Sequence, residues 1–88
     1  KDLVLTLECT NSYTMQVKLY DGRETNEEKM IQIFEMESSE IKELKLKKSK
    51  DYTLYIKNLG PFNRTHSKNF KLKKSCKMTI SQYGIDGC

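Results

Sequence analysis

The sequence predicts an all-β protein, organised as a small antiparallel β-sandwich. Apolar and polar residues alternate with a period of two in several short segments, and turn residues separate these segments. A leucine followed six positions later by a tyrosine, Leu46 and Tyr52, marks a corner between two strands. Eighty-eight residues suffice for one domain with a thin core and exclude a second one. We therefore expect a single domain over residues 1–88.

Alternation predicts the first two strands. One face of residues 3–9 carries Leu3, Leu5, Leu7 and Cys9, and one face of residues 13–20 carries Tyr13, Met15, Val17 and Leu19. The turn residues 10–12 lie between them.

Residues 26–37 fit two interpretations. Asn26, Glu27 and Glu28 are typical of a helix start, whereas the segment 32–34 between polar neighbours is typical of a short strand. Consistency with the surrounding strands favours the strand.

Later strands follow the same period. Tyr52, Leu54 and Ile56 share one face, Phe70 and Leu72 resume the pattern, and residues 76–82 continue it as a further strand. We expect Tyr52 to be buried, with its hydroxyl bonded to the backbone near Leu46 or Lys47.

The Leu46 and Tyr52 corner resembles that of the fibronectin type III sandwich, or of a related immunoglobulin-like one. The resemblance covers residues 3–74. It places 3–9 and 13–20 as the second and third strands, 30–36 and 39–46 as the next two, 52–58 as the sixth and 67–74 as the seventh. The family's first strand is missing, so residues 76–82 form a surplus strand that could cover the open edge.

This placement also guides the cysteine pairing. If residues 77–83 are extended, they carry the chain roughly 23 Å from Cys76, and the five steps from Tyr83 to Cys88 return at most about 18 Å, so a bridge from Cys76 to Cys88 would be strained unless that segment curls. A last strand that runs back from Cys76 would instead deliver Cys88 towards Cys9. We therefore expect a Cys9–Cys88 disulfide, with Cys76 unpaired or bonded outside this segment.

Charge is distributed unevenly. The first 44 residues carry five basic and ten acidic side chains, and the last 44 carry eleven and two. The segment 45–49 (KLKKS) recurs as 71–75, although lysine-rich strand ends also recur by composition alone. Both copies would lie at one pole of the sandwich and form a basic surface of Lys47, Lys48, Lys50, Lys73, Lys74 and Lys77. This surface could bind a heparan-type sugar, an anionic lipid surface or a nucleic-acid backbone. Sequence-specific nucleic-acid binding is not expected, because only two of the sixteen basic residues are arginine.

The loop 59–67 is the alternative contact surface. Phe62, Arg64 and His66 have the composition of a protein-binding anchor, and loops of sandwiches commonly carry binding. A solvated connector with Phe62 folded onto the sandwich is the other interpretation. Asn63 opens an N-glycosylation sequon, and a glycan there would argue against this loop as the contact.

No catalytic or metal-binding pattern can be identified. His66 is the sole histidine, and the three cysteines lack zinc-site spacing. We expect no enzymatic activity and no cofactor.

The expected function is protein binding, as an adhesion or receptor module, with polyanion binding as the alternative. No apolar run approaches the roughly 20 residues of a transmembrane helix. The chain begins at Lys1 without an apolar leader, so we expect a segment of a larger or processed protein, secreted or at the cell surface.

Overall fold

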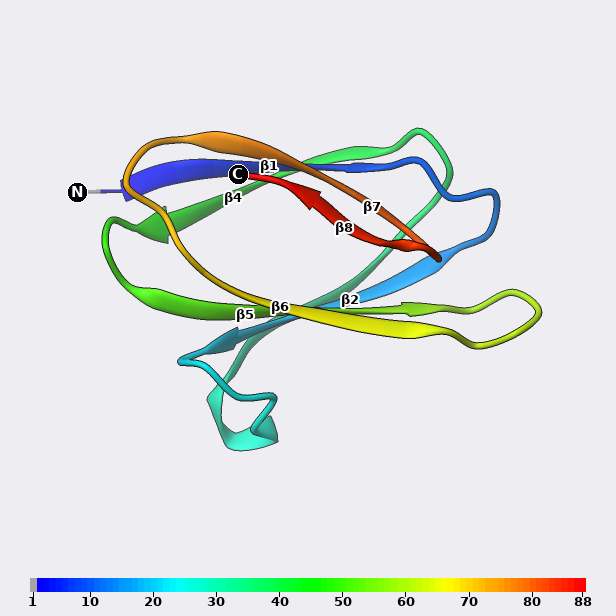
Figure 1. Cartoon of the computed structure of the whole chain (residues 1–88), viewed down its shortest axis with the longest axis horizontal. Coiled ribbons are helices and arrows are strands. Elements are labelled where there is room, and N and C mark those ends of the chain that lie inside the picture. Colours follow the sequence, from blue (N-terminus) through cyan, green and yellow to red (C-terminus); the bar gives the residue numbers. More distant parts are fainter. Residues whose placement is uncertain (1) are drawn as a thin grey trace.

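The computed structural model describes residues 2–88 and builds them mainly from β-strands (Figure 1). The strands are β1 (Asp2–Cys9), β2 (Met15–Asp21), β3 (Met30–Met36), β4 (Ile41–Lys47), β5 (Asp51–Asn58), β6 (Thr65–Lys71), β7 (Cys76–Ser81) and β8 (Gly84–Gly87). A short 3₁₀ helix, η1 (Glu27–Lys29), precedes β3. The all-β prediction is confirmed.

The strands form two four-stranded sheets, in the orders β4-β1-β7-β8 and β3-β2-β5-β6. In Figure 1 the first sheet lies above β2, β5 and β6, and the connections gather at two poles. Connections 10–14, 37–40, 59–64 and 82–83 lie at the right of the view, and connections 48–50 and 72–75 lie at the left. This architecture is compatible with a small β-sandwich.

The core consists of the inward-facing residues of both sheets, as the alternation predicted. Each such side chain stabilises the fold by roughly 1.5 to 3 kcal/mol relative to an exposed one. The fully buried members from the first strands and from β5 are Leu5, Leu7, Cys9, Met15, Val17, Leu19, Leu54 and Ile56. Tyr13 is an exception, because β2 begins only at Met15 and leaves Tyr13 in the preceding loop.

The tyrosine corner is present as expected. Tyr52 is 3% exposed, and its ring stacks on Phe70 with the ring centroids 5.8 Å apart. The Lys47 N–H donates a hydrogen bond of 2.9 Å to the Tyr52 hydroxyl oxygen. This bond fixes the turn between β4 and β5, in which Ser49 adopts a φ of 61°.

Replacing Tyr52 by phenylalanine should lower the free energy of unfolding by about 1 to 3 kcal/mol, because the Lys47 N–H loses its partner. Urea denaturation measures the change. Tyr55→Phe is the matched control, since Tyr55 lies on the same strand with its ring only partly buried. Equal midpoints for Tyr52→Phe and the parent would contradict a stabilising corner.

Residues 26–37 combine the two interpretations. The Asn26 side chain accepts a hydrogen bond of 3.0 Å from the Glu28 N–H and caps η1, but this helix ends after three residues. From Met30 the chain is a strand, as favoured. The register with β2 shifts between Leu19 and Tyr20, so Ile31 has no partner there and forms a β-bulge.

The surplus strand predicted after residue 75 is β7, and it pairs with β1. The pairing is parallel, with Leu5 opposite Cys76 and Cys9 opposite Ile80, so the expectation of a wholly antiparallel fold is wrong here. The reason is the route of the chain. After β6 it crosses to the other sheet at the pole where β1 begins, and both strands then run the same way (Figure 1).

The predicted Cys9–Cys88 disulfide is wrong. Cys76 and Cys88 form the disulfide, with their Cα atoms 5.7 Å apart. Cys9 is a free, buried thiol, and burial raises its pKa. The sequence argument took the chain after Cys76 to continue in one direction.

A hairpin explains the observed pairing. The chain reverses at residues 82 and 83, and β8 returns along β7 with Met78 opposite Gly87. This return delivers Cys88 to Cys76. Gly87 is required, because its φ is 111° and a Cβ atom there would lie 2.3 Å from the Lys77 carbonyl oxygen.

Candidate functional site

Four apolar side chains are exposed at the pole where the β1–β2, β5–β6 and β7–β8 connections meet. Phe62 is 79% exposed, Tyr83 76%, Tyr13 43% and Leu59 40%. We call these four residues the aromatic pole. Exposed apolar side chains are unremarkable one at a time, but a group of them on neighbouring loops is typical of an interaction surface.

A buried polar network holds these loops together. Asn58, at the end of β5, is fully buried, and its amide donates to the Pro61 carbonyl at 3.0 Å and to the Gln82 side chain at 3.3 Å. Its oxygen accepts from the Asn11 amide at 3.0 Å and from the Gly60 N–H at 3.2 Å. Both donors and both acceptor positions of the Asn58 amide are therefore in use.

Asn11 extends the network to the third loop. Its side-chain oxygen accepts a hydrogen bond of 3.1 Å from the Gln82 N–H, and its amide donates to the Tyr13 carbonyl at 2.9 Å. One connected set of amides thus links the β1–β2 loop, the β5–β6 loop and the β7–β8 turn. The network makes the aromatic pole a pre-organised surface rather than three independent loops.

Tyr13 packs directly on the neighbouring loop. A Cβ atom at Gly60 would lie 2.4 Å from the Tyr13 ring, so only glycine permits this contact. The Leu59 N–H also donates to the Thr14 carbonyl at 2.9 Å. The two loops therefore move as one unit.

The tip of the β5–β6 loop has unusual backbone geometry. Phe62 has a φ of 84° and Asn63 a φ of 39°, in the region that large side chains seldom adopt. Pro61 precedes them, and a positive φ after proline is the geometry of a turn that ordinarily carries glycine. This conformation turns the Phe62 ring out to solvent, so the alternative of Phe62 folded onto the sandwich is wrong.

The other two residues predicted in this loop differ from each other. Arg64 is exposed and lies two positions from Phe62, where it remains available to a partner. His66 is partly buried, and its Nε2 lies 2.8 Å from the Gln82 carbonyl oxygen. Because a carbonyl only accepts, this nitrogen carries the hydrogen, and His66 positions the β7–β8 turn. Asn63 is exposed beside Phe62, with Thr65 also exposed.

The six lysines predicted as a basic surface fall into two groups. Lys50 pairs with Asp21 at 3.3 Å and Lys77 pairs with Glu8 at 2.6 Å. Within residues 2–88, the other four form no ion pair and are exposed; they are Lys47, Lys48, Lys73 and Lys74. We call these four the basic pole.

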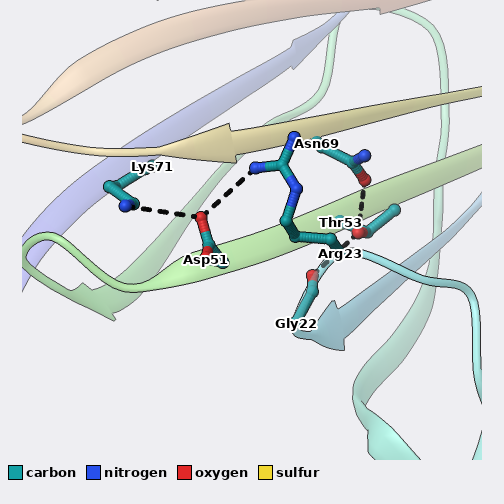
Figure 2. Close-up of polar contacts among 6 residues, drawn as sticks. All are labelled: Gly22, Arg23, Asp51, Thr53, Asn69 and Lys71. Carbon is teal, nitrogen blue, oxygen red and sulfur yellow. Dashed lines mark hydrogen bonds and ion pairs between the residues drawn. The ribbon is translucent and has the colours of Figure 1, made fainter.

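The segment 22–29 arches away from the sheet and leaves a polar hollow of about 450 Å³ beside β5 and β6. Figure 2 shows how the arch is anchored: Asp51 lies between Arg23 and Lys71, at 3.4 and 3.8 Å. The Thr53 hydroxyl lies 2.8 Å from the Gly22 carbonyl oxygen. These contacts pair Arg23 and Thr53, two of the residues that line the hollow. Anchoring of the arch is therefore a sufficient explanation for their presence there.

Tyr20 supports the arch from the outer face of β2. Its hydroxyl donates a short hydrogen bond to the Glu27 carboxylate, which Lys18 also approaches at 3.6 Å. Burial, together with this bond, raises the pKa of Tyr20 to about 12. The same bond and Lys18 lower the pKa of Glu27.

Sequence reasoning missed part of the aromatic pole. Tyr13 was assigned to a buried strand face, and Tyr83 received no role. Asn58 was placed at the end of a strand and given no role, although it is the centre of the network. A usable signal was the set of amide side chains Asn11, Asn58 and Gln82, each at the end of an apolar strand.

Within residues 2–88, no helix is both long enough and apolar enough to span a bilayer. No group of three histidine, cysteine, aspartate or glutamate side chains in this part of the chain is arranged to hold a metal ion.

No protein-family model, curated protein or solved structure matches the sequence.

Proposed function

We propose that this chain is a non-enzymatic protein-binding module of an extracellular or cell-surface protein, of the adhesion or receptor type, and that it contacts its partner through the aromatic pole. The observation that carries the proposal is the exposure of Phe62, Tyr83, Tyr13 and Leu59 on loops joined by a buried amide network. Rigid aromatic anchors lose little conformational entropy on binding and dominate interface energetics.

Two further observations support the proposed extracellular location and the proposed type of sandwich. The Cys76–Cys88 disulfide is compatible with an oxidising compartment outside the cytosol. The Tyr52 corner, and β7 covering the edge of β1, support a fibronectin type III-like sandwich whose first strand is replaced by a later one.

Asn63 is a proposed N-glycosylation site within the same loop. A glycan attached there would stand beside Phe62 and obstruct the contact. Protein secreted from eukaryotic cells should therefore be weighed before and after enzymatic removal of N-glycans, and binding should be measured on both forms.

The double substitution Phe62→Ser and Tyr83→Ser should weaken partner binding by about 700-fold, because hot-spot anchors contribute about 2 kcal/mol or more each and about 1.4 kcal/mol is a factor of ten. The chain can be tetramerised through a tag and used to stain a panel of cells by flow cytometry. The cells are first treated with heparinase to remove sulfated sugars, and protease treatment should then abolish the staining.

Ile31→Ser with Ile33→Ser is the matched control, since both isoleucines are exposed but lie on β3, away from the aromatic pole. The control should stain like the parent. Undiminished, protease-sensitive staining of heparinase-treated cells by the Phe62 and Tyr83 variant would refute the proposed surface.

A further inference from the structure

The two KLKKS segments lie side by side in the structure. The Ser49 N–H donates a hydrogen bond of 2.8 Å to the Leu72 carbonyl oxygen, joining the β4–β5 turn to the β6–β7 connection. The Ser75 hydroxyl accepts a hydrogen bond of 2.9 Å from the Val4 N–H, which ties the second segment to β1. The repeat therefore builds one surface from two distant parts of the chain.

Each copy uses its residues in the same way. Leu46 and Leu72 are both buried and close the core at this pole. The lysine pair that follows each leucine projects into solvent, since the backbone that inserts the leucine turns immediately afterwards. Four lysines thus emerge from two hydrogen-bonded loops, and none of the four is neutralised by an ion pair within residues 2–88.

A hollow of about 210 Å³ adjoins these lysines. Lys71, Lys73 and Lys74 line it together with Leu72 and the Cys76–Cys88 disulfide. This volume is below the roughly 300 Å³ of a pocket that encloses a drug-sized molecule. It suits one compact anionic group of a longer ligand.

Acidic groups nearby reduce the positive charge without removing it. Asp2 is opposite Lys47 on β1, and Asp51 is shared by Lys71 and Arg23. Asp21 neutralises Lys50, and Glu27 on the arch is occupied by Tyr20 and Lys18. Lys48, Lys73 and Lys74 keep their full charge.

The residue composition of the basic pole favours some classes of polyanion over others. Lysine is a point charge without the planar fork that reads bases, and neither arginine is available here, because Arg23 is paired with Asp51 and Arg64 lies in the β5–β6 loop. The exposed aromatic rings that could stack on bases belong to the opposite pole. Among the described residues 2–88, no large exposed apolar side chain accompanies the four lysines to enter a lipid bilayer.

We propose that the basic pole binds a sulfated glycosaminoglycan, with one sulfate group in the hollow lined by Lys71, Lys73 and Lys74. The site goes beyond the proposed protein contact and is separate from it. The molecule is 38 Å along its longest axis, and the two poles lie at opposite ends of the sandwich (Figure 1). One module can therefore hold a sulfated sugar and a protein partner at the same time.

The test is retention and affinity on heparin of the intact, oxidised chain. Changing Lys47, Lys48, Lys73 and Lys74 to glutamine should weaken heparin binding by about 100-fold or more. A control variant with the same loss of charge changes Lys18, Lys29, Lys42 and Lys57, which lie outside the two KLKKS segments and do not line the hollow. The control should lose less than about tenfold, and equal losses in the two variants would mean that net charge alone drives retention and would overturn the site.

Salt and ligand chemistry provide two further criteria. Four contacts to a polyanion as densely charged as duplex DNA predict about a 150-fold fall in affinity from 50 to 200 mM salt. N- and O-desulfated heparin and hyaluronan, which carry carboxylates but not the sulfates, should bind far more weakly than heparin. Equal affinity for desulfated heparin would overturn the assignment of sulfate to the hollow.

The Phe62→Ser and Tyr83→Ser variant separates this site from the protein contact. It should bind heparin like the parent, because its changes lie at the other pole. Loss of heparin binding by this Phe62 and Tyr83 variant, without any change in its folding, would refute the separation of the two sites. Failure of the staining experiment above would leave this result unaffected.

Discussion

Replacing Asn58 by leucine is expected to lower the free energy of unfolding by about 3 kcal/mol. The change removes the partner of four groups at once: the Asn11 amide, the Gly60 N–H, the Pro61 carbonyl and the Gln82 side chain. Each unsatisfied buried group costs about 1 to 3 kcal/mol. The total stays below the sum because the loops can open and expose some of these groups to water.

Thermal denaturation and amide exchange test this expectation together. The melting temperature should fall by roughly 15 °C for a domain of this size. The Gln82 N–H, which donates to Asn11, should exchange faster than the amides in the middle of β5. Gln32→Leu is the control, since Gln32 is exposed on the edge strand β3, outside the amide network, and should change stability by less than about 1 kcal/mol. An Asn58→Leu midpoint within error of the parent would show that the network does not stabilise the loops.

Replacing Cys88 by serine is expected to cost about 3 kcal/mol, the loop-closure contribution of a disulfide that joins residues 12 positions apart. The loss should be concentrated in β8. This strand spans four residues and pairs on one side only, with β7. Residues 84–87 should lose protection from hydrogen exchange, while the pairing of β1 with β4 is retained. Cys9→Ala, which leaves the disulfide intact, should keep β8 protected.

Peptide mapping gives a direct check of the pairing. Trypsin cleaves after lysine and arginine, so under non-reducing conditions peptide 75–77 should remain linked to peptide 78–88. Peptide 2–18, which contains Cys9, should carry a free thiol. A link between peptides 2–18 and 78–88 would contradict the observed disulfide.

The parts of the fold that sequence predicted are those with a local periodic signal. Alternation located the buried faces of β1, β2 and β5, and the spacing of Leu46 and Tyr52 located a corner that one hydrogen bond now explains. β8 had no such signal. Its four residues include two glycines and only one large apolar residue, and the reversal at residues 82 and 83 lacks a typical turn sequence. Because β8 was not predicted, the distance estimate for the cysteines assumed that the chain continued away from Cys76.

The candidate surfaces, like the fold, could be predicted from the sequence only in part. The lysines could be counted in the sequence, but which of them are neutralised depends on long-range contacts, such as that of Lys77 with Glu8 on β1. The composition of the loop 59–67 was enough to predict Phe62 as a contact residue. Tyr13 and Tyr83 join it only because amides from three distant segments meet, and no local pattern encodes that meeting.

The parallel pairing of β7 with β1 has a consequence for how the protein is made. Leu5 and its partner Cys76 are 71 positions apart, and β7 occupies an inner position of its sheet. At roughly 5 to 20 residues per second, a ribosome needs about 4 to 14 s to synthesise the chain between them. During that interval the edge of β1 stays open and able to pair with other strands. Non-local contacts of this kind also slow folding after release. The nascent chain therefore exposes an unpaired strand edge until β7 has closed the first sheet.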